Sequence, residues 1–276
     1  MSSLLGEYLR ARRALVRPEN VGLIPDPDRR VAGLRRDEVA QIAAISPEYY
    51  LRIEQGVHPT PSEPVLRGLA RALLLDEAGE EYMRRLVAGV ERDLADVAPA
   101  TPSAEELEQL LAPWPHVPAA VVDRHMDVAA INRMMLVVTR RAVVVGDNVI
   151  QYIFSGDFRS YAIGWEHLAT QVVAGLRFAG DPESSRYREI VDDLSARSAD
   201  FRRIWARHDV YPWSAGHTTH DLPGVGPVEV PFQNLQIPGT GGHFLAIITP
   251  QPGTAAAEAL AQLAQAAQDP GFELPG

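Results

Sequence analysis

The segment from Arg35 to Gly56 constrains the fold most, because it encodes two short helices joined by a tight turn. Val39 and Ile42 lie on one face of the first helix, and Ala40 is small enough to let a second helix cross closely. Ser46 suits the N-cap of that second helix, where its hydroxyl can accept a hydrogen bond from a free backbone N–H. The pattern therefore predicts a helix-turn-helix.

The second helix of this pair has an exposed edge that is typical of DNA recognition. Tyr50 and Ile53 are expected to point into the core, which leaves Glu48, Tyr49 and Arg52 outside. Side chains in this half of a recognition helix reach base edges in the major groove, and arginine can bind guanine through two hydrogen bonds. A purely structural packing of helices is the alternative, but the combination of cap, small residue, exposed arginine and terminal glycine favours DNA binding.

Further helical patterns surround this pair and complete an all-α domain of five helices. The stretch 17–33 contains several prolines and glycines and is expected to be irregular. Residues 1–90 are predicted to form this domain, and residues 91–103, with two prolines, are predicted to form a linker. The five predicted helices cover residues 4–15, 36–43, 47–55, 63–74 and 77–88.

The distribution of charge reconciles DNA binding with a net charge of −10. Residues 1–75 hold 11 arginines and 9 acidic residues, whereas residues 91–276 hold 13 arginines and 23 acidic residues. The first part can therefore direct arginines at phosphates while the acidic part stays away from them. All 26 basic residues are arginine, which suggests a GC-rich bacterial genome.

Other features of the sequence argue against membranes, secretion and common enzyme classes. No apolar run is long enough to span a bilayer, and the first residues lack a basic segment followed by an apolar core. The absence of cysteine excludes disulfides and thiol nucleophiles and fits a reducing compartment. A phosphate-binding glycine loop, a G-x-S-x-G elbow and an H-E-x-x-H helix are also missing. We expect a cytoplasmic protein that is not an enzyme and needs no cofactor.

Helical and extended patterns alternate from residue 104 to 270 and predict an α+β domain. Ser103 and Glu106 fit a capping box at the start of its first helix. An apolar stripe that starts at Trp165 predicts a long helix. Further helices are predicted over residues 183–196, 199–207 and 254–267. The predicted strands cover residues 117–122, 128–131, 228–237 and 243–249.

The helix-turn-helix segment resembles the lambda-repressor-like regulators of the Xre family. The spacing from Ala40 through Ser46 to Ile53, Glu54 and Gly56 carries this resemblance. Neighbouring residues are similar to an actinobacterial subgroup, the MmyB-like regulators, over the stretches 20–23 and 29–36. The predicted DNA-binding residues are Arg35, Arg36, Ser46, Pro47, Glu48, Tyr49 and Arg52.

Two residues of the N-terminal domain bear directly on this resemblance. Arg13 matches the position that pairs with the motif's glutamate, here Glu54, so we expect a partly buried ion pair between them. Ala44 stands where these regulators usually have glycine. A left-handed backbone at Ala44 would cost about 1 kcal/mol, which a packed domain can tolerate.

From residue 119 onward the chain is similar to the C-terminal ligand-binding domain of MmyB-like regulators, which implies a PAS-like fold. The segment 201–210 carries the best match. We expect a homodimer that binds double-stranded DNA at a palindromic operator and senses a small apolar molecule, such as a fatty acid. An apolar cavity is expected between the sheet and the helices of Trp165 and Trp205, although aromatics at helical spacing are usually plain core. The predicted ligand-binding residues are Trp165, Leu168, Arg177, Phe201, Trp205 and His208, with Arg177 and His208 as candidate anchors for a carboxylate.

Two alternative functions stay open at this point. One is a DNA-binding dimer that responds to no ligand, and the other is a metal-dependent enzyme with a DNA-binding appendage. Imidazole and carboxylate side chains can hold zinc, and they gather in the segment of His208, Asp209, His217, His220 and Asp221. Because this segment is rich in glycine and proline, ordinary loop histidines are the simpler interpretation, and no metal site is predicted.

Overall fold

The computed structural model describes residues 3–25, 29–57, 60–88, 101–222 and 224–267. These residues divide into two compact units. The first unit consists of described residues from two ranges, Met1–Ala95 and Arg203–Tyr211. The second unit consists of described residues from Asp96–Arg202 and Pro212–Gly276. Most of the predicted linker 91–103 lies outside the described residues.

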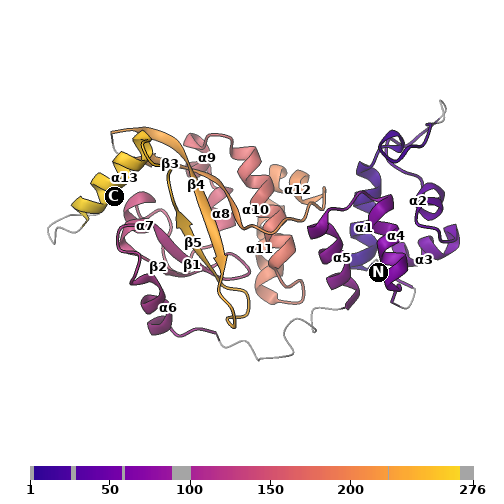
Figure 1. Ribbon diagram of the computed structural model, residues 1–276, viewed down its shortest axis with the longest axis horizontal. Helices are drawn as coiled ribbons and strands as arrows, with labels where there is room; N and C mark the ends of the chain where they lie inside the picture. Colours follow the sequence, from indigo (N-terminus) through magenta and orange to yellow (C-terminus); the bar gives the residue numbers. More distant parts are fainter. Residues whose placement is uncertain (1–2, 26–28, 58–59, 89–100, 223, 268–276) are drawn as a thin grey trace. The chain divides into compact units, whose positions relative to one another are not determined.

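The N-terminal part of the first unit is helical, and the predicted helices are confirmed to within two residues at each end. Its helices are α1 (Leu4–Leu15), α2 (Arg36–Ile42), α3 (Pro47–Gln55), α4 (Glu63–Ala72) and α5 (Glu77–Ala88) (Figure 1). A 3-10 helix, η1 (Pro18–Val21), lies in the stretch predicted to be irregular. The core contains side chains from each α-helix, among them Leu9, Val39, Tyr50, Leu69 and Met83.

The turn between α2 and α3 has the backbone conformation expected from the sequence. Ala44 has a φ of 56°, in the left-handed region that favours glycine. Ser46 caps α3, because its Oγ accepts a hydrogen bond from the backbone N–H of Tyr49 at 3.1 Å. Gly56 ends the helix with a φ of 69°. These local features fix where the second helix of the pair begins and ends.

The second unit has an α+β fold around one antiparallel sheet, which confirms the predicted fold class. The sheet order is β2-β1-β5-β4-β3 (Figure 1). Its strands are β1 (Ala119–Val122), β2 (Val128–Ile131), β3 (Ala215–Leu222), β4 (Gly226–Gln236) and β5 (Phe244–Ile248). The helices after α5 are α6 (Ala104–Leu111), α7 (Arg133–Val138), α8 (Val149–Ile153), α9 (Gly156–Tyr161), α10 (Trp165–Ala179), α11 (Ser185–Arg197), α12 (Ala199–Trp205) and α13 (Ala255–Ala266).

Strand β3 and the three short helices α7, α8 and α9 are not among the elements predicted from the sequence. The expectation of an irregular loop around His217 and His220 is wrong, because both residues lie in β3. This strand is polar in composition, yet it pairs with β4 along its whole length, from Ala215 opposite Gln233 to Leu222 opposite Gly226. The pairing with β4 stabilises β3, and the local sequence pattern of β3 contains no information about that pairing.

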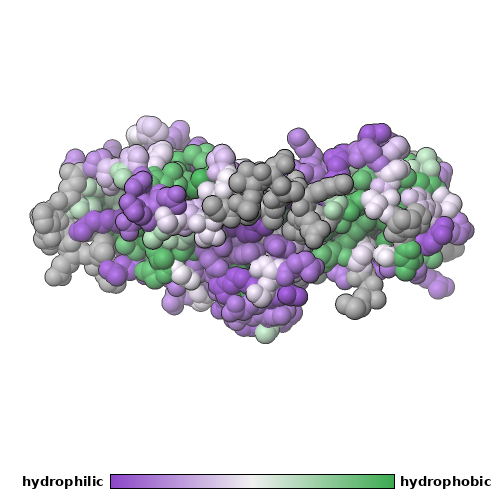
Figure 2. Space-filling model, turned by 90° about the horizontal axis from the view of Figure 1, so that it is seen from below, coloured by the Kyte–Doolittle hydropathy of each residue, from purple (hydrophilic) through white to green (hydrophobic). Residues whose placement is uncertain are grey.

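One face of the molecule is mixed in character. The face of the molecule in Figure 2 carries mainly hydrophilic residues, with apolar residues between them. Among the described residues, no helix combines the length and the apolar composition that crossing a membrane would need.

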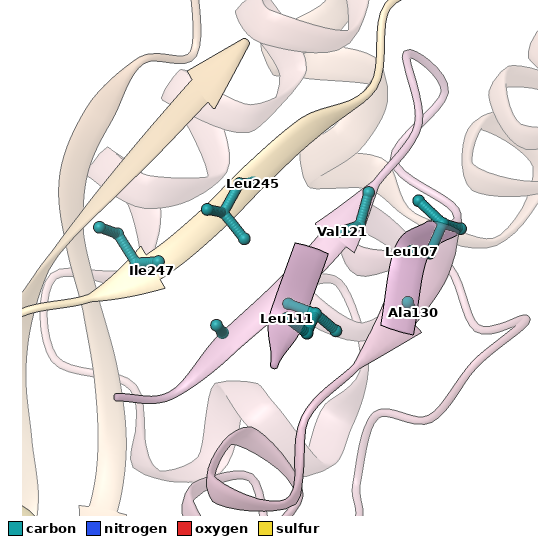
Figure 3. Close-up of a cluster of buried hydrophobic side chains, with 7 residues drawn as sticks. Leu107, Leu111, Val121, Ala130, Leu245 and Ile247 are labelled. Carbon is teal, nitrogen blue, oxygen red and sulfur yellow. The ribbon is translucent and has the colours of Figure 1, made fainter. Parts of the chain in front are cut away.

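The two faces of the sheet have different neighbours. On one face, Val121 of β1 lies opposite Ala130 of β2 and Leu245 of β5, and all three side chains are buried. Leu107 and Leu111 of α6 cover this face and complete an apolar cluster (Figure 3). The other face presents the alternate residues of the same strands, which leaves it available for a separate group of contacts.

Candidate functional site

The N-terminal half of α3 is exposed, as expected for a recognition helix. Ser46, Pro47, Glu48 and Arg52 are exposed, and Tyr49 is half-buried. Tyr50 and Ile53 are buried on the opposite side of the helix. This arrangement presents one arginine and several short polar groups together on one helix edge, which suits contact with base edges.

Glu54 organises the helices around this edge. Its side chain is completely buried, and it accepts hydrogen bonds from Nε of Arg13 and from Nε of Arg36, each at 2.7 Å. Burial alone would raise the pKa of Glu54, but the hydrogen bonds from Arg36 and Arg13 lower it below its ordinary value. Glu54 is therefore a carboxylate that ties α3 to α1 and α2.

This network confirms the predicted pair of Arg13 and Glu54 and adds a second arginine that the sequence analysis missed. Arg36 was predicted only as a DNA contact, but its Nε is bound to Glu54 while half of its side chain stays exposed. Because a carboxylate has two oxygens, a second donor for Glu54 was a reasonable expectation. The exposed part of Arg36 is held by this bond at the start of α2.

A second ion pair fixes the start of α2. Glu38 accepts hydrogen bonds from Nη1 of Arg29 at 2.5 Å and from the backbone N–H of Arg35 at 2.6 Å. The hydrogen bond from Arg29 is the main reason why the pKa of Glu38 is lowered. Arg35 itself is half-buried at the N-cap of α2. The irregular stretch before α2 is therefore attached to the helix that carries Arg36.

The second unit contains a cavity on the face of the sheet opposite α6. Its walls come from all five strands and from α7, α8, α9 and α10, and its space free of atoms is about 720 Å³, part of which is open to solvent. Apolar side chains make most of the wall, among them Val122, Met135, Ile153, Leu168 and Phe232.

Polar side chains interrupt this apolar wall, and three of them have unsatisfied atoms. His220 of β3 and Asn234 of β4 are both buried, and Trp213 lies just before β3. Each has a buried atom without a hydrogen-bond partner among the described residues, namely Nε2 of His220, Oδ1 of Asn234 and Nε1 of Trp213. Burial lowers the pKa of His220 to about 4, so its imidazole is neutral at pH 7.

The predicted ligand-binding residues do not gather at this cavity, with the exception of Leu168. Trp165 is buried and donates from Nε1 to the carbonyl of Ile153 at 2.7 Å, and Phe201 packs edge-on against Phe154. The buried Arg177 is not among the lining residues. The cavity lies against α10, as expected, but α12 with Trp205 contributes no wall residue.

Trp205 and His208 belong instead to the segment Arg203–Tyr211, which groups with the first unit. His208 has a φ of 52°, so its backbone is in the left-handed region. The expectation that His208 or Arg177 anchors a carboxylate stays a prediction. The geometry of the cavity does not support it, because neither residue lines the wall.

The histidines considered as metal ligands are separated by the strand they share. His217 is exposed, whereas His220, three residues on, is buried and faces the other side of the sheet. No group of three or more histidine, aspartate or glutamate side chains suited to a metal ion occurs in the described parts of the chain.

Two parts of the chain match models of known domain families. Residues 4–82 match the model of a helix-turn-helix domain. Residues 103–263 match the MmyB-like transcription regulator ligand binding domain. Among individually curated proteins, none matches the chain.

A helix-turn-helix unit and a ligand-binding domain together define a DNA-binding transcription regulator. The chain belongs to the MmyB-like transcription regulators, whose ligand-binding domain accounts for more than half of its length. Both matched families are domains of transcription regulators and neither is catalytic, so the alternative of a metal-dependent enzyme is not supported.

Proposed function

We propose that this regulator is a cytoplasmic homodimer whose affinity for a palindromic operator responds to a small, mostly apolar molecule in the cavity of the second unit. Residues 1–90 would bind DNA, and residues 104–270 would bind the ligand and dimerise. The apolar cavity carries this proposal, because a unit that served dimerisation alone would not need such a space. A fatty chain fits the apolar walls. The arginine-only basic composition supports an origin in GC-rich bacteria such as actinobacteria.

DNA recognition is assigned to the exposed edge of α3 with the start of α2. Arg52 is exposed in the first two turns of α3, where an arginine can bind a guanine through two hydrogen bonds. In a symmetric dimer, two such helices would enter successive major grooves about 34 Å apart. The ligand can change operator affinity only to the extent that it prefers one arrangement of the dimer over another.

Selection of an operator from random duplex DNA by the full chain, followed by binding titrations, tests the DNA-binding surface. Arg52→Ala should weaken binding to the selected operator by about 1–3 kcal/mol and relax the preference at one base step. Arg71→Ala, which removes an exposed arginine of α4, is the matched control and should leave that preference unchanged. Unchanged preference in Arg52→Ala would contradict the assigned surface.

Native mass spectrometry of the purified chain tests the ligand. A small molecule retained by the full chain, and lost on denaturation, is the expected result. A constitutive DNA-binding dimer would instead show the mass of the protein alone and the same operator affinity before and after extraction with solvent.

A further inference from the structure

We infer that the cavity takes a molecule whose polar group is uncharged and both donates and accepts hydrogen bonds, such as an alcohol or a primary amide, rather than a carboxylate. This inference rests on the proposed function, because it names the chemical class of the ligand in the same cavity. The observations that carry it are the unpaired polar atoms of Asn234, Trp213 and His220 and the lack of charge around them.

The strand register places two of these side chains on the cavity face of the sheet. Asn234 lies opposite Ala246 of β5, which in turn lies next to Ala120 of β1, and all three line the cavity. His220 lies on β3 two residues beyond Thr218, another wall residue, so the two share a face. Both Asn234 and His220 are 8% exposed, so their free polar atoms cannot be satisfied by bulk water.

The bonds that these groups already make define what is missing. Nδ2 of Asn234 donates to the carbonyl oxygen of Trp213 at 2.8 Å, so the amide's Oδ1 is the end left without a partner. An amide oxygen needs a donor, whereas the indole Nε1–H of Trp213 needs an acceptor. A hydroxyl or a primary amide offers both functions, and an ether or a carboxylate offers only acceptors.

Charge complementarity separates an uncharged ligand from a carboxylate. None of the cavity's wall residues in the described structure is an arginine, aspartate or glutamate, and His220 is neutral at pH 7 because burial lowers its pKa. A carboxylate would therefore lose its hydration without gaining a cation, and its oxygens could come to face Oδ1 of Asn234. Arg177, the cation expected to hold such a head group, is not part of the wall.

Isothermal titration of the full chain at about pH 7.5 with three matched probes tests the inference. The probes are octan-1-ol, which donates and accepts, methyl octyl ether, which only accepts, and octanoate, which is charged. We expect octan-1-ol to bind about fivefold more tightly than the ether, as one added hydrogen bond predicts, and at least about tenfold more tightly than octanoate.

Substitutions at Asn234 and at Trp213 assign the hydrogen bonds of the ligand to particular atoms. Asn234→Leu should abolish the preference for the alcohol over the ether, and Gln233→Leu, an exposed neighbour on β4, should preserve it. Trp213→Phe keeps a ring but removes the donor, so it should weaken the alcohol and the ether alike, which gives an independent measurement if Asn234→Leu folds poorly.

The possible failures are distinguishable. Octanoate that binds as tightly as the alcohol would overturn the uncharged class while leaving a ligand-controlled regulator intact. An unchanged alcohol preference in a folded Asn234→Leu would overturn the assigned anchor. Binding of none of the three probes would overturn the ligand-controlled function itself and the inference with it.

Discussion

Burial makes His220 a source of pH-dependent stability in the second unit. Its pKa falls from an ordinary value of 6.5 to about 4, because the cavity wall replaces the water that would hydrate a charged imidazolium. In the unfolded chain the same imidazole binds a proton near pH 6.5. The stability contributed by the neutral form is therefore complete above that pH and is lost as the pH falls toward 4.

The size of this effect follows from the two pKa values. At about pH 5 the unfolded state is almost fully protonated and the folded state almost fully neutral at His220, which lowers the free energy of unfolding by about 2 kcal/mol relative to about pH 7.5. At or below about pH 4 the loss approaches about 3 kcal/mol. Titration of one buried group should thus be visible in ordinary denaturation experiments.

Urea unfolding at these two pH values, followed by tryptophan fluorescence, measures the effect. His220→Leu removes the titrating group and keeps an apolar side chain in the wall, whereas His217→Leu removes an exposed histidine of the same strand. Between about pH 7.5 and 5 the wild-type chain and His217→Leu should lose about 2 kcal/mol more than His220→Leu. An equal loss in all three proteins would refute the assignment of a neutral, buried His220.

Two further predictions concern the first unit and use the same unfolding assay. Ala44→Gly should stabilise the chain by up to about 1 kcal/mol, because Ala44 has a left-handed backbone that glycine adopts without strain. The control Ala43→Gly, at a residue with a φ of −75°, should destabilise the chain. Stabilisation by both substitutions would exclude the backbone explanation. Glu54→Gln should destabilise the chain by about 3 kcal/mol, because it leaves the charge of Arg13 unpaired. The control Glu48→Gln, at an exposed position of α3, should have little effect on stability. Similar losses of stability in both variants would show that the buried carboxylate contributes nothing specific.

The DNA-binding half could be predicted from the sequence because its signals are local. The cap at Ser46, the terminal Gly56 and the apolar spacing between them lie within one helix, so no distant contact is needed to interpret them. The pair of Arg13 and Glu54 is distant in sequence, and it followed from the family resemblance and not from spacing. The hydrogen bond from Arg36 to Glu54 depends on how α2 and α3 pack against each other, which the sequence pattern does not predict.

The cavity could not be predicted in the same way because its walls depend on strand register. Thr218 and His220 reach the cavity only because β3 pairs with β4, and the composition of β3 indicated a loop. A shift of one residue in that pairing would turn both side chains to the opposite face. The helix of Trp165 was predicted correctly, but only Leu168 of its predicted ligand residues reaches the wall, since the direction of each side chain depends on how the helix packs.

The Glu54 network of the first unit and the cavity wall of the second unit differ in charge, and this difference separates their expected responses to salt. In the first unit, two arginines keep the carboxylate of Glu54 ionised, and exposed arginines such as Arg52 are available for phosphates and bases. Binding to DNA therefore releases counterions and should weaken steeply as salt rises. In the second unit, the cavity wall has no ionised side chain in the described structure at pH 7, where the folded state's His220 is neutral. An uncharged ligand in that cavity releases no counterions, so its affinity should stay nearly constant over the same range of salt.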